Sequence, residues 1–424
     1  MTGGCSSPRV GGLRIGIGLA ALLVTAAAHA QPSAPERGDF QLGRFAIDGS
    51  GWVSIAHDPN ITRETTSQAV GGWEVHTSPQ LRARTDFGNF HVSTINALEV
   101  IKITGPSESQ SDSDLSGQPW ANVLSSVDVS RTGSRLSWKT GWLGKDTNAR
   151  PTGFEVGARS RHTERAFTGS AEFNLSSRFS VTGRGSRTRV GYDADAIYND
   201  SSLNETLDKT VVGGGGGVGI RITPLTGVFV TVDYLDETYH RAPELDNTGI
   251  LTLGGFSFRT GAIVAGTIAM GYRTSTNGAG EHPLASPQTL VTLTHTRPSG
   301  ASITATINRD SQQSYDINRG ALTTFSTGLQ GTLTPVKGWT GYWSFVHAAL
   351  TYSVPGTGDD SHTEYIVGAS HPFVYDTRLG VSVNGYSHGD PDSGAGYRGT
   401  RVAVFVAFGH GRWWKQLDLP LPRY

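Results

Sequence analysis

The stretch KTVVGGGGGVGIRI, residues 209–222, is followed by the turn TPLTG, residues 223–227, and then by VFVTVDYLDETY, residues 228–239. Apolar and polar residues alternate in the second run, which is the period-two pattern of a strand with two different faces. The proline and the glycine of the turn supply the fixed and the positive φ values that a tight hairpin needs. These residues predict an antiparallel β-hairpin.

The same unit recurs from residue 44 to residue 409. Alternating runs are joined in turn by tight Pro- and Gly-containing turns and by longer connections rich in Asp, Asn, Ser and Gly, an asymmetry typical of outer-membrane barrels with periplasmic turns and external loops. The count predicts about eighteen antiparallel strands, an even number that places both termini in the periplasm. The predicted strands are 44–56, 70–84, 89–104, 119–131, 135–146, 153–174, 178–192, 209–222, 228–239, 250–258, 262–272, 289–296, 301–308, 322–333, 339–352 and three further runs that reach residue 409.

Composition supports an all-β membrane protein. The chain has 56 Gly and only 2 Met, and Gly costs about 1 kcal/mol per helical position relative to Ala. Mean hydropathy is −0.26, as expected when strands face lipid on one side and water on the other. The net charge of −1 gives no basic surplus that would attract nucleic acid. We therefore expect a single transmembrane antiparallel β-barrel in a Gram-negative outer membrane, inserted by barrel-assembly machinery and surrounded by outer-membrane lipid.

The N-terminus has the pattern of a cleavable secretory signal peptide. Two arginines precede an apolar stretch at 15–27 and a small-residue site at 28–30, so the mature chain is expected to begin near Gln31. The single cysteine, Cys5, would leave with the signal, which excludes a disulfide framework and a zinc-thiolate site. The expected division is a signal peptide at 1–30, a periplasmic segment at 31–43, the barrel at 44–409 and a periplasmic tail at 410–424.

Three short motifs resemble functional sites but are better explained as structural features. The glycine run 213–219 has dinucleotide-binding spacing but lies inside a predicted strand, where a closely approached or kinked barrel wall is the better interpretation. The sequence GYSHG at 385–389 matches a hydrolase nucleophile elbow, but it joins a strand to a polar loop. Residues 107–113 offer weak carboxylate ligands for Ca²⁺ without an EF-hand pattern. We predict no catalytic residue, no cofactor, no metal and no enzyme activity.

Strand parity identifies candidate residues of the barrel interior. If Phe173 and Phe179 face lipid, then Glu172 and Arg184 face inward, and a bare charge facing lipid near the midplane would cost several kcal/mol. Such charges form either an ion-pair network that braces the interior or a polar lining that contacts a passing solute. The predicted lumenal cluster consists of Glu172, Arg184 and Arg221, joined by Asp233, Arg259 and Arg273.

Several segments resemble one known family. The N-terminal AHDPNI at 56–61, the VGY at 190–192 and the segments 208–226 and 229–239 are similar to the β-barrel porin 2-like family, outer-membrane porins associated with exopolysaccharide biosynthesis and export operons. The resemblance implies a channel through which a hydrophilic polysaccharide leaves the cell, working with periplasmic export machinery. The alternative is a general or nutrient-uptake porin for small hydrophilic solutes. The absence of a conspicuously long loop favours the exporter.

Overall fold

The computed structural model describes the barrel and several of its connections. The predicted signal peptide at 1–30, the loop at 107–113 and the tail at 410–424 lie outside the described residues. Described are residues 40–61, 69–104, 119–148, 160–198, 201–259, 261, 263–277, 284–314, 319–334, 338–354, 358–374, 376–389 and 396–409.

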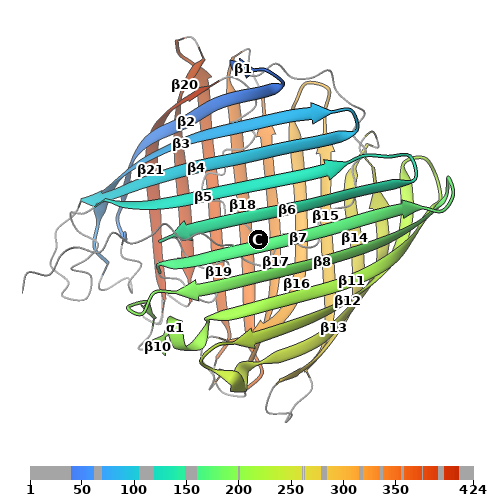
Figure 1. Cartoon of the computed structure of the whole chain (residues 1–424). Helices are drawn as coiled ribbons and strands as arrows, with labels where there is room; N and C mark the ends of the chain where they lie inside the picture. The colour runs from blue at the N-terminus through green and yellow to red at the C-terminus, as the bar shows by residue number, and fades with distance from the viewer. Residues whose placement is uncertain are drawn as a thin grey trace, which may run out of the picture.

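The strands form one closed antiparallel barrel, which confirms the predicted fold class (Figure 1). The sheet has 19 strands, and all except β1 (Phe40–Leu42) belong to a ring of 18 that closes where β2 (Phe45–Asp58) pairs with β21 (Tyr397–Gly409). The other strands of the ring are β3 (Gly72–Phe87), β4 (Phe90–Thr104), β5 (Trp120–Arg131), β6 (Leu136–Thr147), β7 (His162–Asn174), β8 (Phe179–Tyr192), β11 (Lys209–Arg221), β12 (Thr226–Tyr239), β13 (Asn247–Phe258), β14 (Ala265–Asn277), β15 (Leu284–Thr296), β16 (Ser302–Gln313), β17 (Ala321–Leu333), β18 (Thr340–Tyr352), β19 (Asp360–Pro372) and β20 (Thr377–His388).

The two faces of each strand differ as the alternation predicts. On β12, Val232 is 49% exposed, whereas its neighbour Asp233 is 8% exposed. Exposed valine, leucine, isoleucine and aromatic side chains cover the outer wall, and polar side chains mostly point into the barrel. The outer face therefore presents an apolar surface to lipid, as a transmembrane barrel requires.

Short turns and longer connections lie at opposite ends of the barrel, which we call the turn end and the loop end. At the turn end, β3 and β4 are joined by two residues, of which Gly88 has φ 60. A similar turn between β15 and β16 contains Gly300 with φ 86. Positive φ values cost glycine little, so these turns are tight.

Strand boundaries differ from the prediction in several places. The predicted strand 153–174 is observed as β7, a single crossing of His162–Asn174, and 149–159 lie outside the described residues. Strands β15 and β16 extend beyond the predicted 289–296 and 301–308 toward the loop end. There the strands continue to pair beyond the apolar band, because backbone hydrogen bonds between strands do not depend on alternating apolar and polar side chains.

Small elements that the sequence did not predict lie at the loop end. Strands β9 (Ile197–Tyr198) and β10 (Ser201–Ser202) form a separate two-stranded sheet beside helix α1 (Leu203–Thr206), and the 3-10 helix η2 (Pro243–Leu245) follows β12. In Figure 1, α1 and β10 lie at the lower left, close to the ends of the neighbouring strands. Within the described residues, no helix is long and apolar enough to cross a bilayer.

Candidate functional site

The candidate site is the inner wall of the barrel. All six predicted residues lie on the side of their strands opposite the exposed apolar face. The structure distributes them among three groups at different heights instead of the one cluster that parity suggested. Parity in the sequence predicts which face of a strand a residue occupies but not its position along the barrel axis. That position depends on the stagger between neighbouring strands, which parity does not contain. The residues are Glu172, Arg184, Arg221, Asp233, Arg259 and Arg273.

The middle group is an ion pair that crosses an intervening strand. Gly215 on β11 is in register with Arg184 on β8 and with Asp233 on β12. Arg184 Nε donates to Asp233 Oδ1 at 2.5 Å, and its Nη2 donates to Oδ2. A Cβ at position 215 would overlap the Asp233 carboxylate and lie 2.6 Å from the carbonyl oxygen of Val232. The missing side chain therefore makes room for the bidentate pair.

The rest of the glycine run follows the same logic. On the inward face, a Cβ at Gly213 would lie 2.9 Å from Ser186 Oγ, and a Cβ at Gly217 would lie 2.7 Å from Thr231 Cγ2. The outward Gly214 has open space around it. The run lies inside β11, which confirms the prediction of a closely approached barrel wall.

The second group lies at the turn end. Burial, followed by the neighbouring charge of Arg221, lowers the pKa of Arg259, and Glu172 opposes that shift. These three side chains are therefore close enough to interact, although they come from β7, the end of β11 and the residue after β13. Arg221 also donates through Nη1 to the carbonyl oxygen of Ser177 at 3.0 Å.

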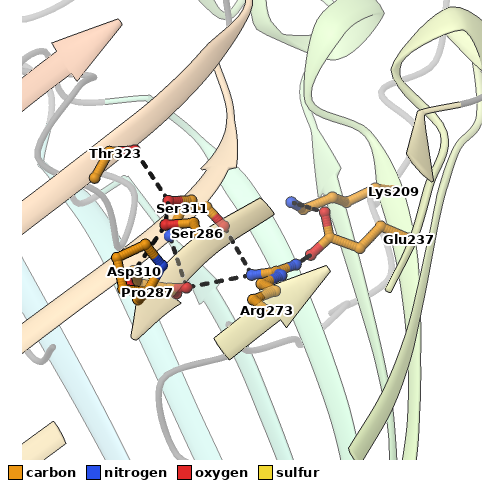
Figure 2. A network of polar contacts seen from close by, with 8 residues as sticks. All are labelled: Lys209, Glu237, Arg273, Ser286, Pro287, Asp310, Ser311 and Thr323. Atoms are coloured by element: carbon orange, nitrogen blue, oxygen red, sulfur yellow. Dashed lines mark hydrogen bonds and ion pairs between the residues drawn. The ribbon is translucent and has the colours of Figure 1, made fainter. Parts of the chain in front are cut away.

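The third group surrounds Arg273 at the loop end (Figure 2). Its Nη1 donates to the carbonyl oxygen of Ser311 at 2.8 Å and to Asp310 Oδ1 at 3.3 Å. Its Nη2 lies 3.8 Å from Glu237 Oε1, and Lys209 Nζ lies 3.6 Å from the other oxygen of that carboxylate. Ser311 Oγ extends the network by donating to Ser286 Oγ at 2.8 Å. Arg273 thus ties strands from opposite sides of β15 together.

Further charged residues of the inner wall were not predicted. Glu164 on β7 lies 3.1 Å from Lys145 Nζ and 3.0 Å from His162 Nε2. On β3, His76 pairs with Glu74 and lies 3.3 Å from Glu99 Oε1. Period-two alternation within 70–84 and 153–174 carried the signal for these residues, but the prediction followed parity only for the strands around β8 and β11.

Two connections form a packed cap at the loop end, which we call the loop cap and define as residues 193–198, 201–208 and 240–246. Leu203 is fully buried beside Tyr192, and Leu245 packs with Tyr239. Leu207 packs against both of these small cores. The loop cap is therefore a structured part of the barrel end.

Hydrogen bonds hold the loop cap to the strands. Asn204 Nδ2 donates to the carbonyl oxygen of Tyr192 at 2.7 Å and to Asp208 Oδ2 at 3.0 Å. The amide of Tyr239 donates to Asp246 Oδ1 at 2.6 Å, and the amide of His240 donates to the carbonyl oxygen of Asp208. Both connections are thus anchored to the ends of the strands that precede them.

Inward side chains differ in exposure between the two ends. Toward the turn end, the side chain of Arg84 is 20% exposed and that of Lys139 is 48% exposed. Toward the loop end, Glu164 is 2% exposed, Arg273 is 5% exposed and Leu350 is fully buried. The described lumen is therefore wet at the turn end and closely packed at the loop end.

The weaker motifs show no site geometry. Ser387 and His388 of the GYSHG motif are consecutive residues near the end of β20, so their side chains point to opposite faces. Among the described residues, no group of three or more His, Cys, Asp or Glu side chains is arranged to hold a metal ion.

A closed 18-stranded barrel with an apolar outer wall and a charged inner wall defines a channel of the porin class in an outer membrane. The chain belongs to the family described as "Putative beta-barrel porin 2", which matches residues 37–281. This confirms the family resemblance of the sequence, and a porin is a channel and not an enzyme. Among curated proteins, none matches the chain.

Several solved porin structures are similar in fold. OccAB4 of Acinetobacter baumannii is 9% identical with a TM-score of 0.44, and the match covers 86% of this chain and 98% of that chain. OccK7 (OpdD) of Pseudomonas aeruginosa is 12% identical with a TM-score of 0.45, covering 87% and 99%. A BenF-like porin from Pseudomonas fluorescens Pf-5 is 10% identical with a TM-score of 0.47, covering 87% and 100%.

Proposed function

We propose that this protein is a passive channel for small hydrophilic solutes. The observation that carries the proposal is the close packing of inward side chains at the loop end, where Glu164, Arg273 and Leu350 are almost completely buried. In a barrel of 18 strands, an unobstructed lumen would leave such side chains facing water. Packing at one end narrows the path to a size suited to small molecules.

This proposal replaces the polysaccharide export that the sequence alone favoured. A polymer chain needs a continuous wide lumen, and we infer that the loop cap and the Arg273 network reduce the open cross-section at the loop end, because both pack against inward residues there. Export would therefore require these contacts to open. Periplasmic export machinery as a partner belongs to that second function and not to the one proposed.

The orientation that we propose follows the usual asymmetry of outer-membrane barrels. The turn end faces the periplasm and the loop end faces the outside, so both ends of the ring, at β2 and β21, lie on the periplasmic side. Solutes then enter through the narrow end and leave through the wet, charged end.

The six inward residues are proposed to line the path. Arg184 and Asp233 neutralise each other, so a solute meets a polar wall without a strongly binding site. Weak contact at several positions suits conduction, because a tightly held solute would not move on. Glu172, Arg221 and Arg259 extend this polar wall toward the turn end.

The test is a clean deletion in the native host, scored both for surface polysaccharide and for uptake of small labelled sugars and amino acids. Single-channel conductance of the purified protein shows separately that it forms a pore. Unchanged surface polymer with slower solute entry supports the proposal. Loss of surface polymer with sugar accumulating in the periplasm would establish export and reject it.

A further inference from the structure

Three arginines project from the outer wall of the barrel, on the face that mostly presents apolar side chains. Arg165 on β7 is directly opposite Arg189 on β8, and Arg187 lies two residues along β8. All three are exposed, whereas the alternate residues Glu164 and Ser186 are buried on the inward face. We call Arg165, Arg187 and Arg189 the outer arginine patch.

The patch carries an electrostatic cost within the protein. Like charges directly opposite each other on neighbouring strands are destabilising, and this is the relation between Arg165 and Arg189. Among the residues that the structure describes, neither Arg187 nor Arg189 has a carboxylate partner within ion-pair distance. An external anion would relieve this repulsion.

The nearest described carboxylates form no ion pair with Arg187 or Arg189. Asp236 lies in the same row as Arg187 two strands away, but the residue between them on β11 is Val212, which has a side chain where the Arg184–Asp233 pair has Gly215. Asp208 contributes to the field at Arg189. Its oxygens already accept hydrogen bonds from the Tyr192 amide and from Asn204 Nδ2.

The position of the patch points to a lipid. Arg187 lies between Phe167 on β7 and Val212 on β11, which are directly opposite it and exposed on the outer wall. A bound amphiphilic anion would place its charged group against the guanidinium groups of the arginines and its apolar part against Phe167 and Val212. Arginine binds phosphate through paired hydrogen bonds, and basic clusters at membrane boundaries recognise anionic headgroups.

We propose that the outer arginine patch binds the phosphate groups of the acylated glycolipid in the outer leaflet of the outer membrane. The patch lies toward the loop end of β7 and β8, which is the end that faces outward in the proposed orientation. The proposal concerns the outer wall, so it does not depend on which solute the lumen carries.

The test measures binding of bisphosphorylated lipid A to the purified barrel in detergent by native mass spectrometry. The double variant Arg187→Gln/Arg189→Gln is compared with Lys102→Gln, which removes one outward-facing, exposed cation near the loop end of β4. We expect about a tenfold or greater loss of affinity in the double variant, because two charge-assisted contacts are removed, and no change in Lys102→Gln. Equal binding by all three proteins would overturn the proposal.

Further controls distinguish binding of the lipid from binding of free phosphate, and a loss of binding from a failure to fold. Dephosphorylated lipid A should bind the native protein weakly, and millimolar inorganic phosphate should not displace lipid A; full displacement by phosphate would reject a lipid site. The variant Arg187→Lys/Arg189→Lys keeps the charges but loses the paired hydrogen bonds, so we expect intermediate affinity. Heat-modifiable migration on gels confirms that each variant is folded before its binding is compared.

Discussion

At the scale of single residues, Gly215 determines whether the ion pair of the inner wall can form. The side chains of Arg184 and Asp233 meet above this glycine from the strands on either side of it. A methyl group there has no space, because it would overlap the Asp233 carboxylate and approach the carbonyl oxygen of Val232. The glycine run of β11 is thus a packing requirement of its neighbours.

Gly215→Ala is expected to destabilise the barrel by about 1–3 kcal/mol, the usual cost of overpacking. The measurement is the urea midpoint of the protein refolded in lipid vesicles. Gly214→Ala is the matched control, since its outward Cβ meets nothing within 4 Å. Equal midpoints for the two variants would show that the Arg184–Asp233 pair does not need the space above Gly215.

Asp233→Asn should shift the ion selectivity of the open channel toward anions, because it leaves the Arg184 charge without its partner on the inner wall. The reversal potential in a salt gradient measures this shift. Asp236→Asn removes the same charge from an outward position of the same strand and should leave the reversal potential unchanged. Identical reversal potentials for both variants would show that Asp233 does not lie on the conducting path.

At the scale of elements, the loop cap is a small packed unit at the loop end, and we propose that it narrows the channel there. Leu203 in α1 is fully buried and packs with Tyr192, while Asn204 fastens the helix to the carbonyl oxygen of the same tyrosine. Removing this apolar side chain leaves a cavity in a small core that has few other contacts.

Leu203→Ala is therefore expected to loosen the loop cap, making residues 193–198 and 201–208 more accessible to protease and raising the single-channel conductance. The local cost is about 2–5 kcal/mol, as for other buried leucines. Leu175→Ala, at an exposed turn-end leucine, is the control and should change neither quantity. A loosened loop cap without any rise in conductance would contradict its role in narrowing the channel.

The elements also show how far the sequence alone could lead. The tight turns and alternating runs predicted the strands of the ring, because a strand with lipid on one side and water on the other has a period-two pattern of apolar and polar residues. They did not predict α1, η2 or the extension of β15 to Leu284. Structure above the apolar band depends on contacts between connections that are distant in sequence, and such contacts leave no periodic signal.

The inner wall was predictable in direction but not in arrangement. Parity predicted one inward cluster that contains Arg184, Asp233 and Arg273, whereas in the structure Arg184 pairs with Asp233 across a strand and Arg273 belongs to a different group. The partner of a lumenal charge is set by the stagger of the closed barrel, which emerges only when β2 meets β21. Charges on the outward face, such as Arg187, were missed because the prediction assumed that face to be apolar.

At the scale of the whole molecule, the barrel combines a wet turn end with a packed loop end. The width of an 18-stranded ring would admit a hydrated polymer if its lumen were open throughout. The buried inward residues at the loop end, Glu164, Arg273 and Leu350 among them, are the basis of our proposal that it is not. We therefore propose that passage through the channel is limited by the size of the solute.

The most direct measurement is permeation of neutral saccharides of increasing length through the purified protein in liposomes, followed by swelling. We expect fast entry of monosaccharides and a steep decline in the entry rate with each added sugar unit, with no passage of long polymer. Permeation that stays nearly constant from monosaccharide to polysaccharide would contradict this proposal.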